Sequence, residues 1–260
     1  MKQILINSNR KQLDECLSLA EKYGLGFEYS DFSSPKVLDD EEMLGAIIEE
    51  YKEKELPVYT TIHGAFFDII PFSVDEKIRE IANLRIEQSI SAAKRIGAKA
   101  VVFHTNYVPF LSTEEYKESW IKTNTAYWSS VLEKHVDIDI YLENMFDASP
   151  DMLAALSKNL SVYKNYGVCL DWSHAVLSKE EPRNWAESLG KYVKHVHIND
   201  NDLVSDLHLA WGDGEIDRNE FYECYEKYMK GAAVLIETAP YESKLRSVEL
   251  LIEEGFLKVE

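Results

Sequence analysis

Carboxylate and imidazole side chains recur at a regular position in this 260-residue chain, at or just after the ends of short apolar runs. Nothing in strand stability requires an ionisable residue at one such end after another. Oxygen and imidazole donors together suit divalent transition metals better than Ca²⁺ or Mg²⁺. The candidate ligands are four acids and five histidines: Glu143, Asp171, Asp206, Glu237, His63, His104, His174, His197 and His208.

One quartet carries the strongest prediction, because its members come from four different apolar runs. If the fold gathers those ends, four unpartnered ionisable groups would repel and lose solvation at a cost on the order of several kcal/mol each. A divalent cation removes that cost. We therefore expect one ion, Mn²⁺, Zn²⁺ or Co²⁺, to be held by Glu143, Asp171, His197 and Glu237.

The other five candidates can provide additional metal ligands, for up to three ions, or contact the substrate. They are His63, His104, His174, Asp206 and His208. A neighbouring histidine, His195, lies two residues before His197 and so points to the same side of an extended strand, nearer its middle. We expect His195 to be structural and to fill the interior of the fold.

Eight apolar runs must position these side chains. They are continuous, as in strands buried on both faces of a parallel sheet, and span residues 3–8, 26–30, 57–63, 99–105, 137–143, 167–173, 193–199 and 233–238. Helical segments lie between them, one opened by a capping box at Ser73 and Glu76 and ended by Gly97. This pattern predicts an α/β fold, a single (β/α)₈ TIM barrel domain over residues 1–260, with its site at the carboxyl ends of the strands.

An open doubly wound sheet is the rival architecture. It would require a glycine-rich phosphate-binding turn after the first strand, and the segment SNRKQ (8–12) has no glycine.

Charge and composition restrict the partners. Lys and Arg number 28 against 46 Asp and Glu, a net charge of −18, which argues against nucleic acid and anionic membranes. Three cysteines are too few for a disulfide framework. The first residues lack a signal-peptide apolar stretch, and no segment has the length of a membrane span. We expect a cytoplasmic protein.

The ordered set of motifs resembles the xylose-isomerase-like TIM-barrel superfamily, which includes sugar isomerases and epimerases and endonuclease IV. The strings are HGAFFD (63–68), VVFHTNY (101–107), LEN (142–144), VCLDWSH (168–174), HVHINDN (195–201), DLHLAWGDGEID (206–217) and IET (236–238).

The resemblance implies a divalent-metal-dependent sugar isomerase or epimerase that holds one metal through the quartet. Glu143 and Glu237 would be the acid/base pair, with the metal stabilising an enediolate. His174 matches a position that contacts substrate hydroxyls. The implied partner is a small-molecule sugar or sugar derivative.

Two positions depart from the ketose 3-epimerases of this family. Leu203 stands where they carry an Arg, and Ser149 stands where they carry a second acid. The five additional candidates match, in type and order, the further ligands of the endonuclease IV trinuclear zinc site, so a zinc phosphodiesterase is the alternative. Against DNA stand the net charge and the acidic segment 31–40, which lacks the Arg and Gln side chains that endonuclease IV-like proteins insert into the duplex.

Two further readings stay open. One is a metal-dependent dehydratase or lyase acting on a polyol or keto-sugar. The other is a degenerate, non-catalytic binding barrel, which would usually have lost Glu143 or Glu237, and this chain retains both.

Aromatic residues in the expected strand-end loops favour a ring-shaped substrate. Phe66, Trp172 and Trp211 are the main candidates for contact with it. The same loops hold four more aromatic residues that could form a lid or a contact in a homo-oligomer: Phe67, Tyr107, Phe110 and Tyr241.

Overall fold

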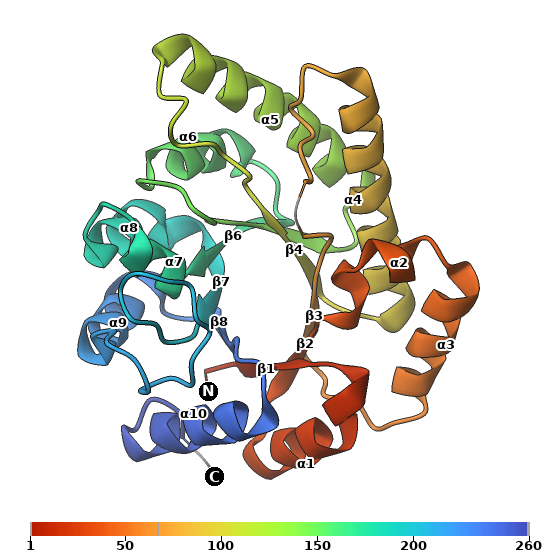
Figure 1. The fold of residues 1–260 in the computed structure, drawn as a ribbon, viewed down its shortest axis with the longest axis vertical. Helices are drawn as coiled ribbons and strands as arrows, with labels where there is room; N and C mark the ends of the chain where they lie inside the picture. The colour runs from red at the N-terminus through yellow and green to blue at the C-terminus, as the bar shows by residue number, and fades with distance from the viewer. Residues whose placement is uncertain (1, 67, 259–260) are drawn as a thin grey trace.

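Eight parallel strands close into a barrel in the computed structural model, which describes residues 2–66 and 68–258 (Figure 1). Each strand pairs with the next along the chain, and β1 pairs with β8, which confirms the predicted architecture. The strands are β1 (Ile4–Ser8), β2 (Gly26–Tyr29), β3 (Thr60–His63), β4 (Ala100–His104), β5 (Asp139–Glu143), β6 (Tyr166–Asp171), β7 (Val193–Ile198) and β8 (Ala233–Ile236).

Helices follow the strands and surround the barrel, as Figure 1 shows along the barrel axis. Two of them, α4 and α5, are 21 residues long. The helices are α1 (Leu13–Tyr23), α2 (Pro35–Leu38), α3 (Glu41–Lys52), α4 (Glu76–Ile96), α5 (Glu114–Lys134), α6 (Asp151–Leu160), α7 (Trp172–Leu177), α8 (Pro182–Leu189), α9 (Arg218–Cys224) and α10 (Tyr241–Glu253).

The start of α4 differs from the predicted capping box. Asp75 is the N-cap, and its carboxylate accepts a hydrogen bond from the Lys77 amide at 2.9 Å. Ser73 instead accepts from the Asp75 amide at 3.2 Å, in the turn before the helix. Asp and Ser are equally favourable at the N-cap position, so Asp75, which is nearer the first turn of the helix, serves as the N-cap. Gly97 ends α4 in the left-handed conformation, at φ +83°, as expected.

The barrel interior changes character along its axis. The part below the carboxyl ends of the strands holds two small apolar clusters. One consists of Ala100, Val102, Tyr141 and Cys169, and the other of Leu5, Ala233 and Leu235. His195 is buried there and stacks on Tyr141 with ring centroids 5.9 Å apart, which confirms its interior-filling place. The large hydrophobic core lies outside, between the strands and the helices.

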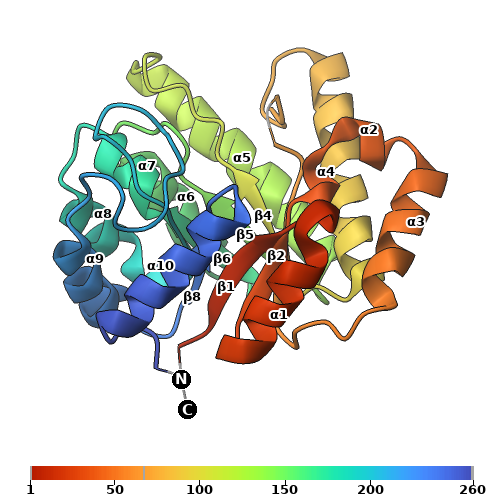
Figure 2. The same cartoon turned by 60° about the horizontal axis from the view of Figure 1, so that its bottom comes forward.

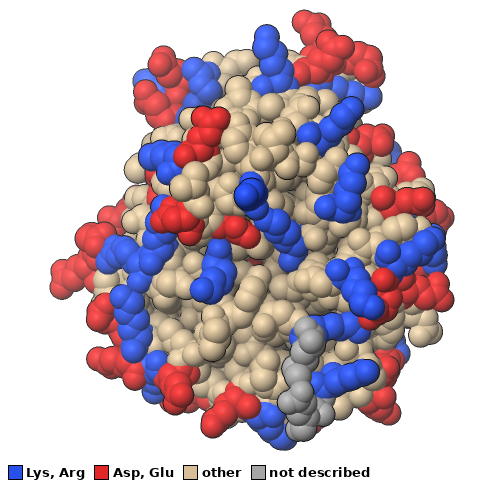
Figure 3. Space-filling view, turned by 180° about the vertical axis from the view of Figure 1, so that it is seen from behind, with Lys and Arg blue, Asp and Glu red and all other residues tan. Residues whose placement is uncertain are grey.

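The two ends of the barrel face different surroundings. Figure 2 shows β1 beginning and α10 ending at one end, with the long loops after the strands at the other. Seen from the end where the strands begin, Lys and Arg side chains surround an uncharged centre, and Asp and Glu gather toward the rim (Figure 3). These cations cannot contact a substrate bound at the opposite end. No helix in the described part of the chain could cross a membrane.

Candidate metal centre

Several predicted ligands follow, two residues later in the same strand, a side chain that points into the barrel interior. They therefore lie nearer the carboxyl ends of the strands, at the barrel mouth. Side chains two residues apart in a strand point to the same side. His104 therefore lies above Val102, and Glu143 above Tyr141. The same spacing relates Asp171 to Cys169, His197 to His195 and Glu237 to Leu235. Strand register adds the lateral order, since His104 pairs with Glu143 and Asp171 pairs with His197.

Glu143 lies at the centre of the cluster. Its Oε2 atom is 3.6 Å from Nε2 of His63 and 3.6 Å from Nε2 of His104. Its Oε1 atom is 3.5 Å from Nδ1 of His197 and 3.7 Å from Nδ1 of His174. The two carboxylate oxygens thus face two different sets of imidazoles, so Glu143 could contribute to two neighbouring ligand groups.

All nine predicted ligands lie at this mouth. Within each of three groups the donor atoms lie within 4.8 Å of one another: His63, His104 and Glu143; Glu143, Asp171 and His197; and His174, Asp206 and His208. Glu237 adjoins the second group, since its Oε2 atom is 3.2 Å from Nδ1 of His197. The described structure therefore brings the whole predicted set together at the barrel mouth, as three groups of candidate ligands.

A fourth grouping of potential ligands lies deeper in the barrel and is less suited to a metal. It consists of Cys169, His195 and His197. Burial raises the pKa of the Cys169 thiol well above its usual range. The sulfur therefore stays protonated, and a thiol is a poor ligand compared with a thiolate.

Three of the histidines are oriented by backbone carbonyls. Nδ1 of His63 lies 3.0 Å from the Gly64 oxygen, that of His174 lies 2.9 Å from the Asn144 oxygen, and that of His208 lies 3.1 Å from the Glu237 oxygen. Donation from Nδ1–H leaves Nε2 with a free lone pair, the usual arrangement for a metal-ligating histidine.

The same orientation directs two of these rings toward one carboxylate and so forms the third group. With both Nδ1 atoms held, Nε2 of His174 and Nε2 of His208 lie 3.3 and 3.2 Å from Oδ2 of Asp206.

Buried oxygen and nitrogen atoms that could ligate a metal, and that lack a hydrogen-bond partner, concentrate at the centre. Among the described residues they include Glu143 Oε2, Asp171 Oδ2, His197 Nδ1 and Asp206 Oδ1. Buried polar atoms that lack a partner cost free energy. A cation would satisfy the carboxylate oxygens and imidazole nitrogens that face one another, so the donor set fits a divalent ion.

Proton affinities at the centre show how strongly these groups interact. Burial raises the pKa of Asp171 to about 6. Burial would also raise the pKa of Glu143, but His197 and His104 hold it well below its ordinary value. His63 is affected in the opposite sense: burial favours its neutral form, yet Glu143 raises its pKa to about 9. A divalent ion would compete with these imidazole protons for the same carboxylates.

One residue of this cluster was missed in the sequence. Glu28, in β2, is only 2% exposed. Its Oε1 atom lies 3.3 Å from Nε2 of His197, and its Oε2 atom lies 3.2 Å from Nε2 of His195 and accepts a 2.7 Å hydrogen bond from Thr61. The available signal was a single carboxylate inside the apolar run GFEYS.

Two of the three predicted substrate-contacting aromatic residues are placed elsewhere, which corrects that expectation. Trp172 and Trp211 are 0% exposed and pack edge-on against Phe221, each with ring centroids 5.4 Å apart. Both rings belong to the outer hydrophobic core, so neither can contact a ligand at the mouth. Phe66 does lie at the mouth, 4.8 Å from the His104 ring. Phe67 falls outside the described residues.

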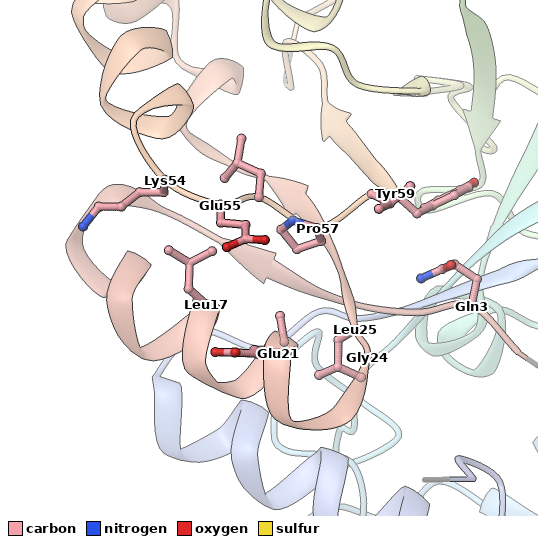
Figure 4. Close-up of a pocket in the computed structure, with 12 residues that line it drawn as sticks. Gln3, Leu17, Glu21, Gly24, Leu25, Lys54, Glu55, Pro57 and Tyr59 are labelled. Atoms are coloured by element: carbon pink, nitrogen blue, oxygen red, sulfur yellow. The ribbon is translucent and has the colours of Figure 1, made fainter. Parts of the chain in front are cut away.

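A separate hollow lies at the opposite end of the barrel. Figure 4 shows it beside α1, with Leu17 and Glu21 on one side and Glu55 and Pro57 on the other. Its volume is about 490 Å³. None of the nine candidate ligands lines it, so it is distinct from the metal centre.

Comparison with known proteins places the chain in a family. A family model described as "Xylose isomerase-like TIM barrel" matches residues 11–254. The chain belongs to this family.

Individual relatives and structural neighbours carry different descriptions. An uncharacterized protein of Methanocaldococcus jannaschii is 29% identical over 207 residues, 75% of this chain and 70% of the relative. A probable endonuclease 4 of Mycobacterium leprae is 26% identical over 201 residues, 72% of this chain and 75% of the relative. The crystal structure of a D-tagatose 3-epimerase-like protein superposes with a TM-score of 0.78 at 24% identity, over 97% of this chain and 96% of the other, which shows a shared fold.

Proposed function

We propose that this chain is a divalent-metal-dependent enzyme that transfers protons on a small sugar or sugar derivative, as an isomerase or epimerase. The placement of Glu143 and Glu237 carries the proposal. Their carboxylate oxygens lie 3.5 and 3.2 Å from the same atom, Nδ1 of His197. Two carboxylates that meet beside one imidazole at the barrel mouth can act as acid and base on a substrate held between them.

The quartet Glu143, Asp171, His197 and Glu237 would hold the ion, as Mn²⁺, Zn²⁺ or Co²⁺. When bound, such an ion supplies Lewis-acid polarisation of substrate carbonyl and hydroxyl oxygens. His174 would orient a substrate hydroxyl through Nε2, because its Nδ1 atom is held by the Asn144 carbonyl.

The two carboxylates differ in their access to water. The Glu143 side chain is 1% exposed, whereas the Glu237 side chain is 19% exposed. A proton taken up by Glu237 would therefore exchange with solvent more readily than one held by Glu143. Because that proton exchanges with solvent, hydrogen from the solvent should be incorporated into the sugar during the reaction and can be used to detect it.

Deuterium uptake tests the proposal directly. Metal-loaded protein is incubated with a panel of aldoses, ketoses and keto-glycosides in D₂O, and deuterium next to the carbonyl is measured by NMR. We expect uptake into at least one sugar, its loss in Glu237→Gln, and its retention in Glu242→Gln, a control at an exposed acid in the first turn of α10. Metal-loaded protein that exchanges no hydrogen in any sugar would contradict the proposal.

Hydrolysis of a phosphoester is the second candidate, favoured by a specific observation. Two ligand groups stand beside the quartet, and proton transfer at the quartet requires neither: His63 and His104 with Glu143, and His174 with Asp206 and His208. A multinuclear zinc centre can activate water for attack on phosphorus. Turnover of bis(p-nitrophenyl) phosphate by zinc-loaded protein, without deuterium exchange in sugars, would favour this function. A dehydratase or lyase would instead release water or a fragment from a polyol in the same sugar panel.

A further inference from the structure

The candidate ligands leave one side of the barrel mouth free. They come from β3 to β8 and from the segments that follow these strands, whereas β1 and β2, which lie side by side next to β8 in Figure 1, contribute none of the nine. On β2 the inward-facing carboxylate of Glu28 is already engaged by Thr61 and two histidines. A substrate bound beside the ligands therefore meets the inward-facing side chain of β1.

Asn7 is that side chain. Leu5, two residues earlier, belongs to an apolar cluster of the barrel interior, so Asn7 points to the same side, one level nearer the mouth. Strand register pairs Asn7 with Glu28 of β2. On the other side, the register of β1 with β8 places Asn7 next to Glu237, with about 5 Å between the two backbones.

The Asn7 amide is accessible and lacks a partner. The residue is half-buried. Its Oδ1 atom is buried without a hydrogen-bond partner, and its Nδ2 atom, which forms no hydrogen bond with the described residues either, is not fully buried. Leu5 fills the interior beneath it and is 0% exposed, so solvent reaches the amide from the mouth. A polar group of a ligand in the mouth can therefore reach this end of the amide.

A neutral hydroxyl is the group that fits this position. A hydroxyl can donate to an amide oxygen or accept from an amide nitrogen, so it pairs with the accessible atom in either orientation of the amide. A phosphate fits poorly, because the carboxylates of Glu28 and Glu237 flank Asn7 and would repel a further anion. Arg10, the cation in the turn after β1, already faces the Asp31 carboxylate at 3.8 Å.

We infer that Asn7 is a substrate-binding residue that holds a neutral hydroxyl of the substrate on the side of the mouth away from the candidate ligands. The inference rests on the proposed function in one respect, namely that the rest of the substrate lies at the metal centre, within reach of Glu237. It deepens that function by naming the substrate class, a polyhydroxy compound that carries no phosphate at this position.

Hydroxamates provide probes that need no turnover, because they chelate divalent ions through two oxygen atoms. Two matched pairs differ by one hydroxyl: acetohydroxamate and glycolohydroxamate, and propionohydroxamate and 3-hydroxypropionohydroxamate. Isothermal titration calorimetry measures their dissociation constants for the full-length protein loaded with Mn²⁺. In at least one pair we expect the hydroxylated member to bind about fivefold more tightly, the usual effect of one hydrogen bond. The phosphate ester of that member should lose this gain.

Asn7→Ala should abolish the gain, so that both members of the pair bind with equal affinity. Asn7→Leu keeps the size of the side chain without its polar atoms, and it should have the same effect. Asn219→Ala, at an exposed asparagine in the first turn of α9, should keep the gain of the wild type. A merely structural role of Asn7 would instead weaken both members of a pair by the same factor.

Equal affinity of the wild-type protein within both pairs would overturn the inference, as would a gain that persists in an Asn7→Ala protein that melts like the wild type. If Asn7→Ala does not fold, Asn7→Leu decides in its place. A phosphate ester that binds as tightly as the hydroxyl compound would overturn the assigned substrate class.

The two proposals can fail separately, since the probes report binding and not proton transfer. A hydroxyl gain that depends on Asn7, without deuterium exchange in any sugar, leaves the binding role standing. Deuterium exchange without such a gain leaves only the proton-transfer function. Metal-loaded protein that binds no hydroxamate at all would overturn the binding role of Asn7 as well.

Discussion

Glu28 Oε1 lies 3.3 Å from Nε2 of His197, and Nδ1 of the same ring lies 3.2 Å from Oε2 of Glu237. One nitrogen of the imidazole thus faces a carboxylate inside the barrel, and the other faces the metal centre. A carboxylate behind a ligating histidine fixes the ring and makes it more basic. We therefore propose that Glu28 positions His197 and is not itself a ligand.

Glu28→Gln should lower the affinity for Zn²⁺ or Mn²⁺ by about 10- to 100-fold, the usual effect of removing such a partner. The amide keeps the shape of the side chain but loses the charge that attracts the imidazole. Competition with a chromogenic chelator measures the affinity. Glu21→Gln, at an exposed site on α1, is the control. Unchanged affinity in a correctly folded Glu28→Gln protein would contradict the positioning role.

Removal of metal should lower the melting temperature. An ion that binds only the folded state adds about 2.7 kcal/mol at a free concentration of 100 times its dissociation constant. For a chain of this length that corresponds to roughly 5–10 °C. Differential scanning calorimetry with chelator and with graded additions of Mn²⁺ or Zn²⁺ measures the shift. A melting temperature that is insensitive to both would argue against every metal-dependent function proposed here.

Asp206→Asn should reduce the number of bound zinc ions. Its Oδ2 atom is the point on which His174 and His208 converge, and an amide oxygen is a much weaker ligand than a carboxylate. If all three groups bind zinc, the variant should hold one ion fewer, as measured by elemental analysis after dialysis. Glu215→Gln, at an exposed acid in the same loop, should keep the wild-type count. An equal count in both variants would exclude the third group as a zinc site.

The pKa of Asp147 predicts how stability depends on pH. Burial raises this pKa from its ordinary 3.8 to about 6, so between these values the folded state holds a proton that the unfolded chain has released. Stability is therefore lost as the pH rises through this window. Asn cannot ionise, so Asp147→Asn should gain stability over the wild type as the pH rises from 4 to 7, by up to about 3 kcal/mol. Urea unfolding at both pH values measures the difference, and an advantage that does not grow with pH would contradict the assignment.

The fold was predictable because continuous apolar runs and helix boundaries carry local signals. The quartet followed from it, since a barrel gathers the strand ends around one axis. Glu28 could not be assigned in this way, because its partners His195 and His197 are more than 160 positions away along the chain. Trp172 and Trp211 were assigned wrongly because nearness to a strand end does not reveal whether a side chain points to the mouth or to the outer core. Both packed on Phe221 instead.

The single carboxylate of Glu143 faces His63 and His104 with one oxygen and His197 and His174 with the other. If two ions shared this ligand, they would not bind independently. An ion bound at one position would neutralise part of the Glu143 charge and fix its orientation, which would weaken binding at the other. The amount of bound metal should therefore rise in distinguishable steps during a titration instead of following a single hyperbola. The order of those steps would show which ligand group fills first as the free metal concentration rises.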